Sequence, residues 1–388
     1  MEGLLPRTGF AALVAAAAAL DRFTLVDVGC SGGIDPAWRG FGGKLVAVGY
    51  DPDIDECERL QAGEDLPGVR YVAGFVGIDP DGAYARTRRA GSPWSRNPWQ
   101  RLAVQRSVEQ VEGRDAATRR DNNLWQQARL ADPASPVLLP RDLAARGIDD
   151  VDMLKIDVDG SDLGILESMA GALASMQVIG VGLEVNYFGS DDPTDHSFHA
   201  MDRFMRGHGF DLFALSVRRY AHAALPSRYV QGVPGPGVFG RPFQGDALYL
   251  RDRGADGGAA LRQELGPAKL LKLAAIASLA GVPDLASDIL ARHRAALARL
   301  IDVARGLDLL AAQAQPGVAA PLGYDAYMAA FARGDGPFAA LDPLGDAPGD
   351  GGADGVAALR LRLAAMEAST SWRVTAPLRW LMSRVRGG

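Results

Sequence analysis

One short stretch, residues 25–33, limits most strongly what this chain can fold into. It reads Leu-Val-Asp-Val-Gly-Cys-Ser-Gly-Gly, so an apolar run that holds one aspartate leads into a cluster of glycines. β-Branched and other apolar residues favour a strand that is covered on both faces. Glycine lets the chain turn into a helix and lets a ligand lie against the main chain. The stretch therefore predicts an α/β fold with a site for a polar cofactor where the first strand ends and a helix dipole begins.

The spacing of the glycines favours one cofactor over another. A dinucleotide-binding turn has glycine at its first, third and sixth positions, but Gly29 is followed by Cys30 and a serine. The pattern Asp27-x-Gly29-x-x-x-Gly33 resembles motif I of the class I S-adenosylmethionine-dependent methyltransferases. This resemblance implies that Asp27 organises the loop around the methionine part of the cofactor, and that Gly29 and Gly33 leave room for it. The alternative is a plain strand-to-helix turn in another α/β protein.

Four more residues are predicted to contact the cofactor. Cys30 lies in the glycine turn, either as a small residue that fills the turn or as a thiol acidified by a helix N-terminus. Residues 44–50 form a second apolar run ending at Asp51, about 20 positions after the turn, where an acidic residue can bind both ribose hydroxyls of an adenosine. The alternative for Asp51 is a carboxylate that caps a helix starting near Asp53. In the methyltransferase interpretation a third strand, residues 69–76, ends beside the adenine, where Phe75 or Val76 supplies an apolar face.

A second block, residues 151–163, is the most specific part of the sequence. It reads Val-Asp-Met-Leu-Lys-Ile-Asp-Val-Asp-Gly-Ser-Asp-Leu, a strand that ends at Asp157 and a helix that begins near Ser161. The block resembles the Leu-Lys-Ile-Asp-Val-Glu-Gly signature of the FkbM family, a group of S-adenosylmethionine-dependent O-methyltransferases. The resemblance covers residues 20–252, with the motifs in the family's order. Asp159 departs from it, because the family more often has Glu there; the charge is kept but the reach is shorter.

The candidate catalytic residues lie where strands are predicted to end. O-Methylation needs an acceptor hydroxyl held in line with the methyl group and a group that takes its proton. Asp157 is a candidate to bind the acceptor, act as the base or help to hold a metal, and the alternative is a structural role at the strand end. Glu184 has the same ambiguity, and Asp159 and His196 complete the set. His196, with His199 three residues later, is either a base or ligand or an exposed residue at a helix end.

Further strands are expected at residues 178–185, 210–215 and 247–250, with an acid-rich helix start before His196. The resemblance implies the seven-stranded, mostly parallel, Rossmann-like sheet of a class I methyltransferase, with helices on both faces and an antiparallel pair at one edge. The long polar span of residues 77–135 is expected to be either a lid over the site or a solvated loop.

Composition and periodicity divide the chain into four parts. These are a methyltransferase domain with a leading helix (1–253), a helical region (254–333), a Gly/Asp/Pro-rich flexible linker (334–356) and a last helix with a basic, aromatic tail (357–388). The tail resembles the Ser-Trp-Arg-x-Thr-Ala-Pro-Leu-Arg ending of many bacterial polysaccharide glycosyltransferases, which implies a place in cell-surface glycan assembly. Its Arg and Trp residues suit an anionic membrane surface, a glycosyltransferase partner, or docking on the helical region.

Charge and cysteine content exclude several classes of protein. A net charge of −6 over 388 residues argues against a general nucleic-acid binder. Two cysteines are too few for a disulfide framework or a cysteine-based zinc site, and they fit a reducing cytoplasm. The predicted function is therefore S-adenosylmethionine-dependent O-methylation of a hydroxyl-bearing acceptor such as a glycan. The alternatives are a methyltransferase-like module that recruits glycan enzymes without catalysis, and a nicotinamide-dependent oxidoreductase.

Overall fold

The computed structural model describes most of the sheet and of the helices that cover it. The described residues are 4–5, 7–77, 129–158, 161–187, 197–220, 241–251 and 265–334. The chain divides into two compact units, residues 1–327 and 328–388, and the sheet belongs wholly to the first. The C-terminal tail, nearly all of the predicted linker and most of the predicted insertion at 77–135 lie outside the described residues.

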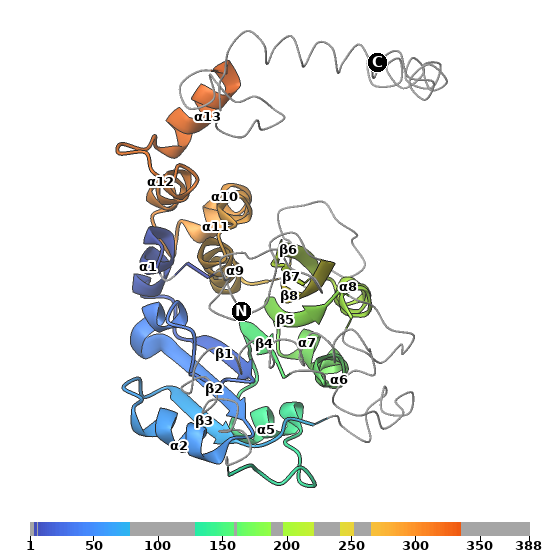
Figure 1. Ribbon diagram of the computed structural model, residues 1–388. Helices are drawn as coiled ribbons and strands as arrows, with labels where there is room; N and C mark the ends of the chain where they lie inside the picture. The colour runs from blue at the N-terminus through green and yellow to red at the C-terminus, as the bar shows by residue number, and fades with distance from the viewer. Residues whose placement is uncertain are drawn as a thin grey trace, which may run out of the picture. The chain divides into compact units, whose positions relative to one another are not determined.

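An eight-stranded sheet forms the centre of the first unit (Figure 1). The strands are β1 (Phe23–Val28), β2 (Leu45–Asp51), β3 (Val69–Ala73), β4 (Met153–Ile156), β5 (Gly180–Asn186), β6 (Asp211–Leu215), β7 (Arg218–Tyr220) and β8 (Arg241–Leu250). They follow the order β3-β2-β1-β4-β5-β8-β6, and β7 also pairs with β8. Neighbours from β3 to β5 run parallel, whereas β8 is antiparallel to β5, β6 and β7. This arrangement confirms the predicted mostly parallel sheet with antiparallel pairing at one edge.

The antiparallel edge is longer than the sequence predicted. β8 spans ten residues, so it pairs with both β6 and the short β7. The break between β6 and β7 falls at Ser216, whose hydroxyl accepts a 2.8 Å hydrogen bond from the Asp246 N–H. A Cβ on Gly245 would lie 2.1 Å from the Ser216 carbonyl oxygen, so glycine permits this close contact. The Arg-Arg-Tyr sequence of β7 has no apolar alternation, and β7 was therefore not predicted.

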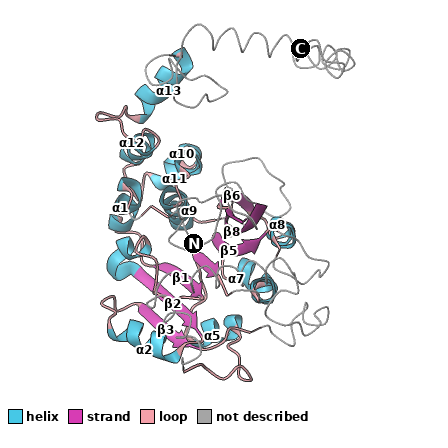
Figure 2. Cartoon of the chain, viewed as in Figure 1, coloured by secondary structure: helices cyan, strands magenta, loops and turns pink. Residues whose placement is uncertain are grey.

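Helices cover both faces of the sheet (Figures 1 and 2). The face that carries Leu25 and Met153 packs against helices from the two ends of the unit, and the opposite face, with Val26 and Leu154, packs against helices from its middle. The first set comprises α1 (Gly9–Ala16), the 3-10 helix η1 (Trp38–Lys44), α2 (Ile54–Ala62), α9 (Pro267–Leu279), α10 (Pro283–Arg292), α11 (Arg294–Leu297) and α12 (Val303–Gln313). The second set comprises α5 (Leu139–Ala145), α6 (Asp162–Ser168), α7 (Ala170–Ser175) and α8 (Phe198–Gly207). The last described helix is α13 (Tyr324–Arg333).

The central helix of the first face is α9. Every residue from Lys269 to Leu279 is buried, as expected for a helix that is covered on all sides. A Cβ on Gly180 of β5 would lie 3.5 Å from Ile276 Cδ1, so the helix runs close to the sheet. Helices α10, α11 and α12 share one hydrophobic core with α9 and this face of the sheet, within the compact unit that extends to Tyr327.

The leading helix, predicted over residues 1–20, is represented among the described residues by α1 alone. Thr8 begins it, because its Oγ1 accepts a 3.1 Å hydrogen bond from the Ala11 N–H, the usual geometry of an N-cap. The same hydroxyl shares a 2.8 Å hydrogen bond with Ser278 Oγ of α9. The cap therefore also fixes α1 against α9.

Two buried lysines of α9 meet an aspartate at the start of β4, and we call this group the Asp152 cluster. Lys269 Nζ donates to Asp152 Oδ1 at 2.7 Å, and Lys272 Nζ donates to Asp152 Oδ2 at 2.9 Å. Asp152 Oδ2 also accepts a 2.7 Å hydrogen bond from the Thr24 N–H of β1, and Asp150 makes a further ion pair with Lys269. Charge-assisted hydrogen bonds of this kind are the stronger ones, so the Asp152 cluster ties α9 to β1 and β4.

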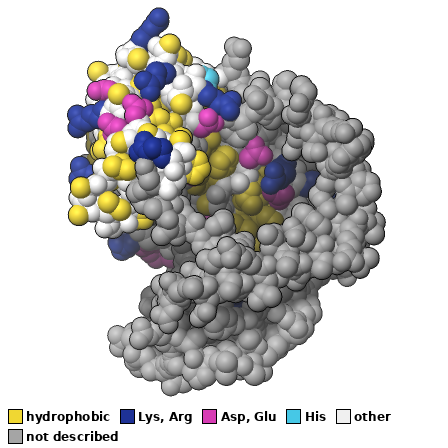
Figure 3. Space-filling model, turned by 90° about the horizontal axis from the view of Figure 1, so that it is seen from above, with side chains coloured by type: hydrophobic (Ala, Val, Ile, Leu, Met, Phe, Trp, Pro, Cys, Tyr) yellow, Lys and Arg dark blue, Asp and Glu magenta, His cyan; other side chains and the backbone are white. Residues whose placement is uncertain are grey.

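The surface offers no single basic face in the view from above. There, Lys and Arg side chains are interspersed with acidic and hydrophobic ones over the described residues (Figure 3). Among the helices of the described ranges, none is long and apolar enough to cross a bilayer.

Candidate functional site

The turn after β1 carries three glycines with left-handed backbone. Gly29, Gly32 and Gly33 have φ values of 83°, 82° and 94°, which favour glycine over other residues. The Gly29 N–H donates to the Tyr50 carbonyl oxygen at 2.8 Å and so holds the turn against β2. A Cβ on Gly29 would lie 1.8 Å from the Asp157 carbonyl oxygen. Gly29 is therefore needed for the turn to lie against the end of β4, whatever room it also leaves for a ligand.

The expected helix dipole at the end of β1 is not found. The next helical element is η1, a 3-10 helix that begins only at Trp38. The reason is local, because consecutive left-handed residues at Gly32 and Gly33 cannot continue into a right-handed α-helix. Any ligand of this turn therefore meets its backbone and side chains rather than the N-terminus of an α-helix.

Substitution of the glycines tests this geometry. We expect Gly29→Ala to lower the free energy of unfolding by about 3 kcal/mol or more, because left-handed strain adds to a clash with β4. Gly32→Ala is the matched control, since Gly32 has nearly the same φ and nothing lies within 4 Å of its added Cβ. It should cost only about 1–2 kcal/mol. Urea unfolding of both variants measures the difference, and equal losses would show that the contact with Asp157 is unimportant.

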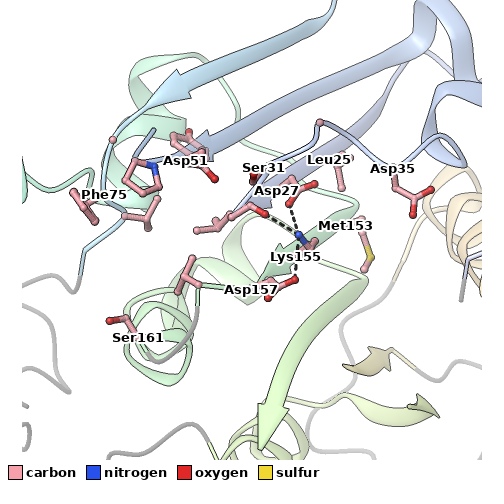
Figure 4. Close-up of a pocket in the computed structure, with 18 of the residues that line it drawn as sticks. Leu25, Asp27, Ser31, Asp35, Asp51, Phe75, Met153, Lys155, Asp157 and Ser161 are labelled. Carbon is pink, nitrogen blue, oxygen red and sulfur yellow. Dashed lines mark hydrogen bonds and ion pairs between the residues drawn. The ribbon is translucent and has the colours of Figure 1, made fainter. Parts of the chain in front are cut away.

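A cavity of about 560 Å³ lies at the carboxyl ends of β1, β2 and β4 (Figure 4). Its wall brings together predicted site residues that are far apart in the sequence. Those that line it are Asp27, Gly29, Gly33, Asp51, Phe75, Val76 and Asp157. Other lining residues include Ser31, Lys155 and Ser161. The sheet topology thus makes one site from three separate motifs.

Asp51 occupies one end of this cavity. It is the last residue of β2 and is buried, with a relative exposure of 4%. Its Oδ1 accepts a 2.9 Å hydrogen bond from the Asp53 N–H, whereas Asp53 itself caps α2 by accepting from the Glu56 N–H at 3.0 Å. The proposed alternative, that Asp51 is the cap, is therefore wrong. Burial raises the pKa of Asp51, and the bond from Asp53 opposes that rise only partly.

A lysine and two aspartates meet at the centre of the cavity (Figure 4). Lys155 Nζ lies 3.2 Å from Asp27 Oδ1 and 3.5 Å from Asp157 Oδ2, and it donates to the Gly29 carbonyl oxygen at 2.9 Å. Burial raises the pKa of Asp27, although Lys155 acts against this. Burial alone lowers the pKa of Lys155, but the charges of Asp27 and Asp157 outweigh it and raise that pKa. Lys155 is therefore a cation at physiological pH and cannot serve as a base.

Phe75 and Val76 follow β3 rather than ending it. Both are half-buried on the cavity wall near Asp51. A backbone hydrogen bond holds this segment in place, because the Phe75 carbonyl oxygen accepts from the Val137 N–H at 2.7 Å. An apolar edge thus lies next to the buried carboxylate.

Cys30 lies in the turn, but it packs in the core and is not among the residues that line the cavity. A hydrogen bond with Cys57, together with burial, raises the pKa of the Cys30 thiol. The thiol therefore stays protonated at physiological pH, which favours the small-residue interpretation over an acidified thiol. Its predicted contact with a cofactor stays a prediction.

Glu184 lies on β5 and also stands outside the cavity wall. It is buried directly opposite Asp246 of β8 in the antiparallel pair. Ile156 pairs with Leu183, so Asp157, which follows β4, lies level with Glu184 inside β5. Asp159 and His196 lie outside the described residues, and their roles stay predictions.

Among the described residues, no group of three or more His, Cys, Asp or Glu side chains is arranged to hold a metal ion.

Lys155 is the residue at the site that sequence reasoning missed. The signal was present, because Lys155 and Asp157 are two positions apart and alternate residues of a strand share a face. What was absent from the sequence is the register, which places Lys155 directly opposite Asp27 of β1.

The sheet order defines the class of protein. A dinucleotide-binding sheet has the parallel order 3-2-1-4-5-6, whereas here the last strand, β8, is inserted antiparallel between β5 and β6. With helices on both faces and the glycine turn after β1, this is the Rossmann-like fold of the class I methyltransferases.

The family comparison agrees with the fold. Residues 139–212 match the family model described as the Methyltransferase FkbM domain. The matched segment runs from α5 to β6 and holds both Asp157 and Glu184. The match covers about a fifth of the chain and includes residues 151–163, the block in which the sequence is most specific. A search among curated proteins found no match.

Two of the solved structures that are similar to this chain are methyltransferases. A magnesium protoporphyrin IX methyltransferase from Synechocystis PCC 6803 with bound SAM has 9% identity, with 62% of this chain and 76% of that chain covered, at a TM-score of 0.28. A SAM-dependent methyltransferase from Agrobacterium tumefaciens has 11% identity, with 62% and 60% covered, at a TM-score of 0.31. These likenesses are too distant to assign an activity.

Proposed function

We propose that this protein is an S-adenosylmethionine-dependent O-methyltransferase whose acceptor is a sugar hydroxyl of a cell-surface polysaccharide. The observation that carries the proposal is the cavity at the strand ends, where the glycine turn, Asp51 and Asp157 line one wall. The FkbM match of residues 139–212 supports methyl transfer as the chemistry.

The cavity suits S-adenosylmethionine in charge and in the kind of groups it presents. Asp27 Oδ1 is buried and, apart from its ion pair with Lys155, accepts no hydrogen bond among the described residues. It can accept one from the ammonium group of the methionine part. At the other end Asp51 can accept hydrogen bonds from ribose hydroxyls, with Phe75 and Val76 beside the adenine. The bound cofactor supplies an electrophilic methyl group.

The side chain that faces the acceptor is Asp157. Its side chain is 32% exposed, so it is open to the cavity while it is held by Lys155. A carboxylate in this place can accept a hydrogen bond from the acceptor hydroxyl and take its proton. Because Lys155 stays charged, Asp157 is the better candidate for the base.

A sugar acceptor is supported by the sequence of the C-terminal tail, which resembles the ending of many bacterial polysaccharide glycosyltransferases. Glu184 and Asp246 lie opposite each other on β5 and β8, but both are buried and neither lines the cavity. The acceptor side of the proposed site is therefore represented by Asp157.

Transfer to a surface glycan tests the proposed function. We expect the purified protein to move a labelled methyl group from S-adenosylmethionine to glycans isolated from a strain that lacks the protein. Mass spectrometry should show those glycans lighter than wild-type glycans by one CH₂ per repeat. Cofactor binding without transfer to any glycan would instead favour the non-catalytic recruiting module.

The raised pKa of Asp51 makes the stability of the folded protein depend on pH. Since its pKa is raised in the folded protein, the native state loses stability as the pH rises through the window between the ordinary and the raised pKa. Asp51→Asn keeps an oxygen for the Asp53 N–H but does not titrate. We expect it to melt at or above the wild-type temperature at neutral pH, with that advantage lost below the ordinary aspartate pKa. A lower melting temperature at neutral pH would contradict this expectation.

The proposal includes a place of action in the cell, which rests on the C-terminal tail. Residues 357–388 lie outside the described residues, so their contact with an anionic membrane, or with a glycosyltransferase, rests on their Arg and Trp content. Truncation after Ala368 should retain cofactor binding and reduce flotation with anionic vesicles at low salt. Equal flotation of both proteins would exclude the membrane contact.

A further inference from the structure

Lys155 connects the two halves of the proposed site. Its ammonium group reaches Asp27 and the Gly29 carbonyl oxygen on the cofactor side, and Asp157 on the acceptor side. The lysine side chain is only 17% exposed. A buried ammonium with three oxygen partners has little freedom to move, and it fixes each partner relative to the others.

The sheet register makes this arrangement a property of the fold. Asp27 and Lys155 are direct partners across β1 and β4, and Asp157 follows two residues later on the same face. The Asp157 N–H donates to the Val28 carbonyl oxygen at 3.0 Å, which continues the β1–β4 contact past the end of the strand. Two carboxylates are thus brought to one place, where they repel each other unless a cation lies between them.

We propose that Lys155 is a positioning residue, which holds Asp27 as a carboxylate for the cofactor and fixes the position of the Asp157 side chain for the acceptor. This inference rests on the proposed function, because it assigns a role within the same site. Removing the ammonium leaves Asp27 buried beside another carboxylate, so Asp27 should take up a proton near neutral pH. Its raised pKa in the presence of Lys155 agrees with this direction. The charged groups that face Asp27 from the described elements are Lys155 and Asp157 of the β4 end, with Asp51 of β2 and Asp35 of the segment after the glycine turn on the same cavity wall.

The test compares Lys155→Met with Lys155→Arg in the full-length protein. Calorimetric titration with S-adenosylmethionine across the neutral range should show a nearly constant affinity for the wild type. For Lys155→Met we expect the affinity to be at least about tenfold weaker at neutral pH and to recover by up to about tenfold per pH unit as Asp27 ionises. Lys155→Arg keeps the cation and should restore a flat pH profile. At saturating cofactor, kcat should fall for Lys155→Met and be partly restored by Lys155→Arg.

Two further variants identify the source of any change. Lys44→Met is the matched control, because Lys44 also donates to a backbone carbonyl, that of Ala17 at 2.6 Å, away from the cavity. It should leave affinity, pH profile and kcat unchanged. The double variant Lys155→Met/Asp27→Asn removes both charges. It guards against misfolding of the single variant, because Asp27 is then no longer a buried carboxylate without its cation. It should bind S-adenosylmethionine weakly, with an affinity that does not depend on pH.

The outcomes separate the inference from the proposed function. Failure of the wild type to bind S-adenosylmethionine would overturn the proposed function. Wild-type binding and turnover together with an unchanged profile in Lys155→Met would overturn the role of Lys155 alone. A pH dependence that persists in the double variant would also overturn it, because Asp27 would then not be the titrating group.

Discussion

Asp157→Asn is expected to lower the rate of methyl transfer by about a hundredfold or more, the usual scale for loss of an acid–base group. Asparagine keeps the size of the side chain and can still accept a hydrogen bond, but it cannot take the proton of the acceptor hydroxyl. The change lies directly after β4, whereas Asp51 ends β2, two strands away in the sheet. Affinity for S-adenosylmethionine should therefore stay within a few-fold of wild type.

Steady-state assays at saturating cofactor and acceptor measure this effect. Asp149→Asn is a suitable control, because Asp149 precedes β4 and its side chain is 88% exposed, in a surface ion pair with Arg22. Its turnover should equal that of the wild type. If Asp157→Asn also turned over at the wild-type rate with the true acceptor, Asp157 would be structural and the base would lie elsewhere.

Asp152→Ala is expected to lower the free energy of unfolding by about 3–5 kcal/mol, the scale for breaking a buried ion pair from one side. The substitution leaves the ammonium groups of Lys269 and Lys272 buried without their shared carboxylate. It also removes the acceptor of the Thr24 N–H on β1. These losses add up at the junction of α9 with the sheet, which lies at the opposite ends of the strands from the cavity.

Chemical denaturation compares this variant with a surface ion pair on the next helix. Asp288 pairs with Arg292 on α10, and the two side chains are 41% and 45% exposed. Asp288→Ala should change stability by no more than about 0.5 kcal/mol. A similar small change for Asp152→Ala would mean that α9 is held to the sheet by apolar packing alone.

Local patterns predicted the parallel part of the fold well. The apolar runs of β1 and β2 are buried over their whole length or nearly so, and each ends at or next to an aspartate or glycine that turns the chain. The burial of side chains whose partners lie far away in the sequence was not predictable. Lys269 and Lys272 look like solvent-facing residues of a helix, but the carboxylate that buries them lies more than a hundred residues away in sequence.

The candidate site shows the same limit. Motif spacing was enough to place Asp27, Asp51 and Asp157 at strand ends, and the sheet brings all three to one cavity. Motif spacing was not enough to show that Asp27 and Asp157 share the ammonium group of Lys155, because that contact depends on the register between β1 and β4. For the same reason Glu184 was grouped with Asp157, although it is buried in β5 opposite Asp246 of β8 and is not among the residues that line the cavity.

The central claim is that the cavity binds S-adenosylmethionine through Asp51 and the turn after β1. Isothermal titration calorimetry of the full-length protein with S-adenosylmethionine, and separately with a nicotinamide dinucleotide, tests it most directly. We expect one molecule of S-adenosylmethionine to bind per chain, no binding of the dinucleotide, and an affinity about ten- to a hundredfold weaker in folded Asp51→Ala, because hydrogen bonds to a carboxylate are lost. Binding of the dinucleotide instead, or an unchanged affinity in Asp51→Ala, would contradict the claim.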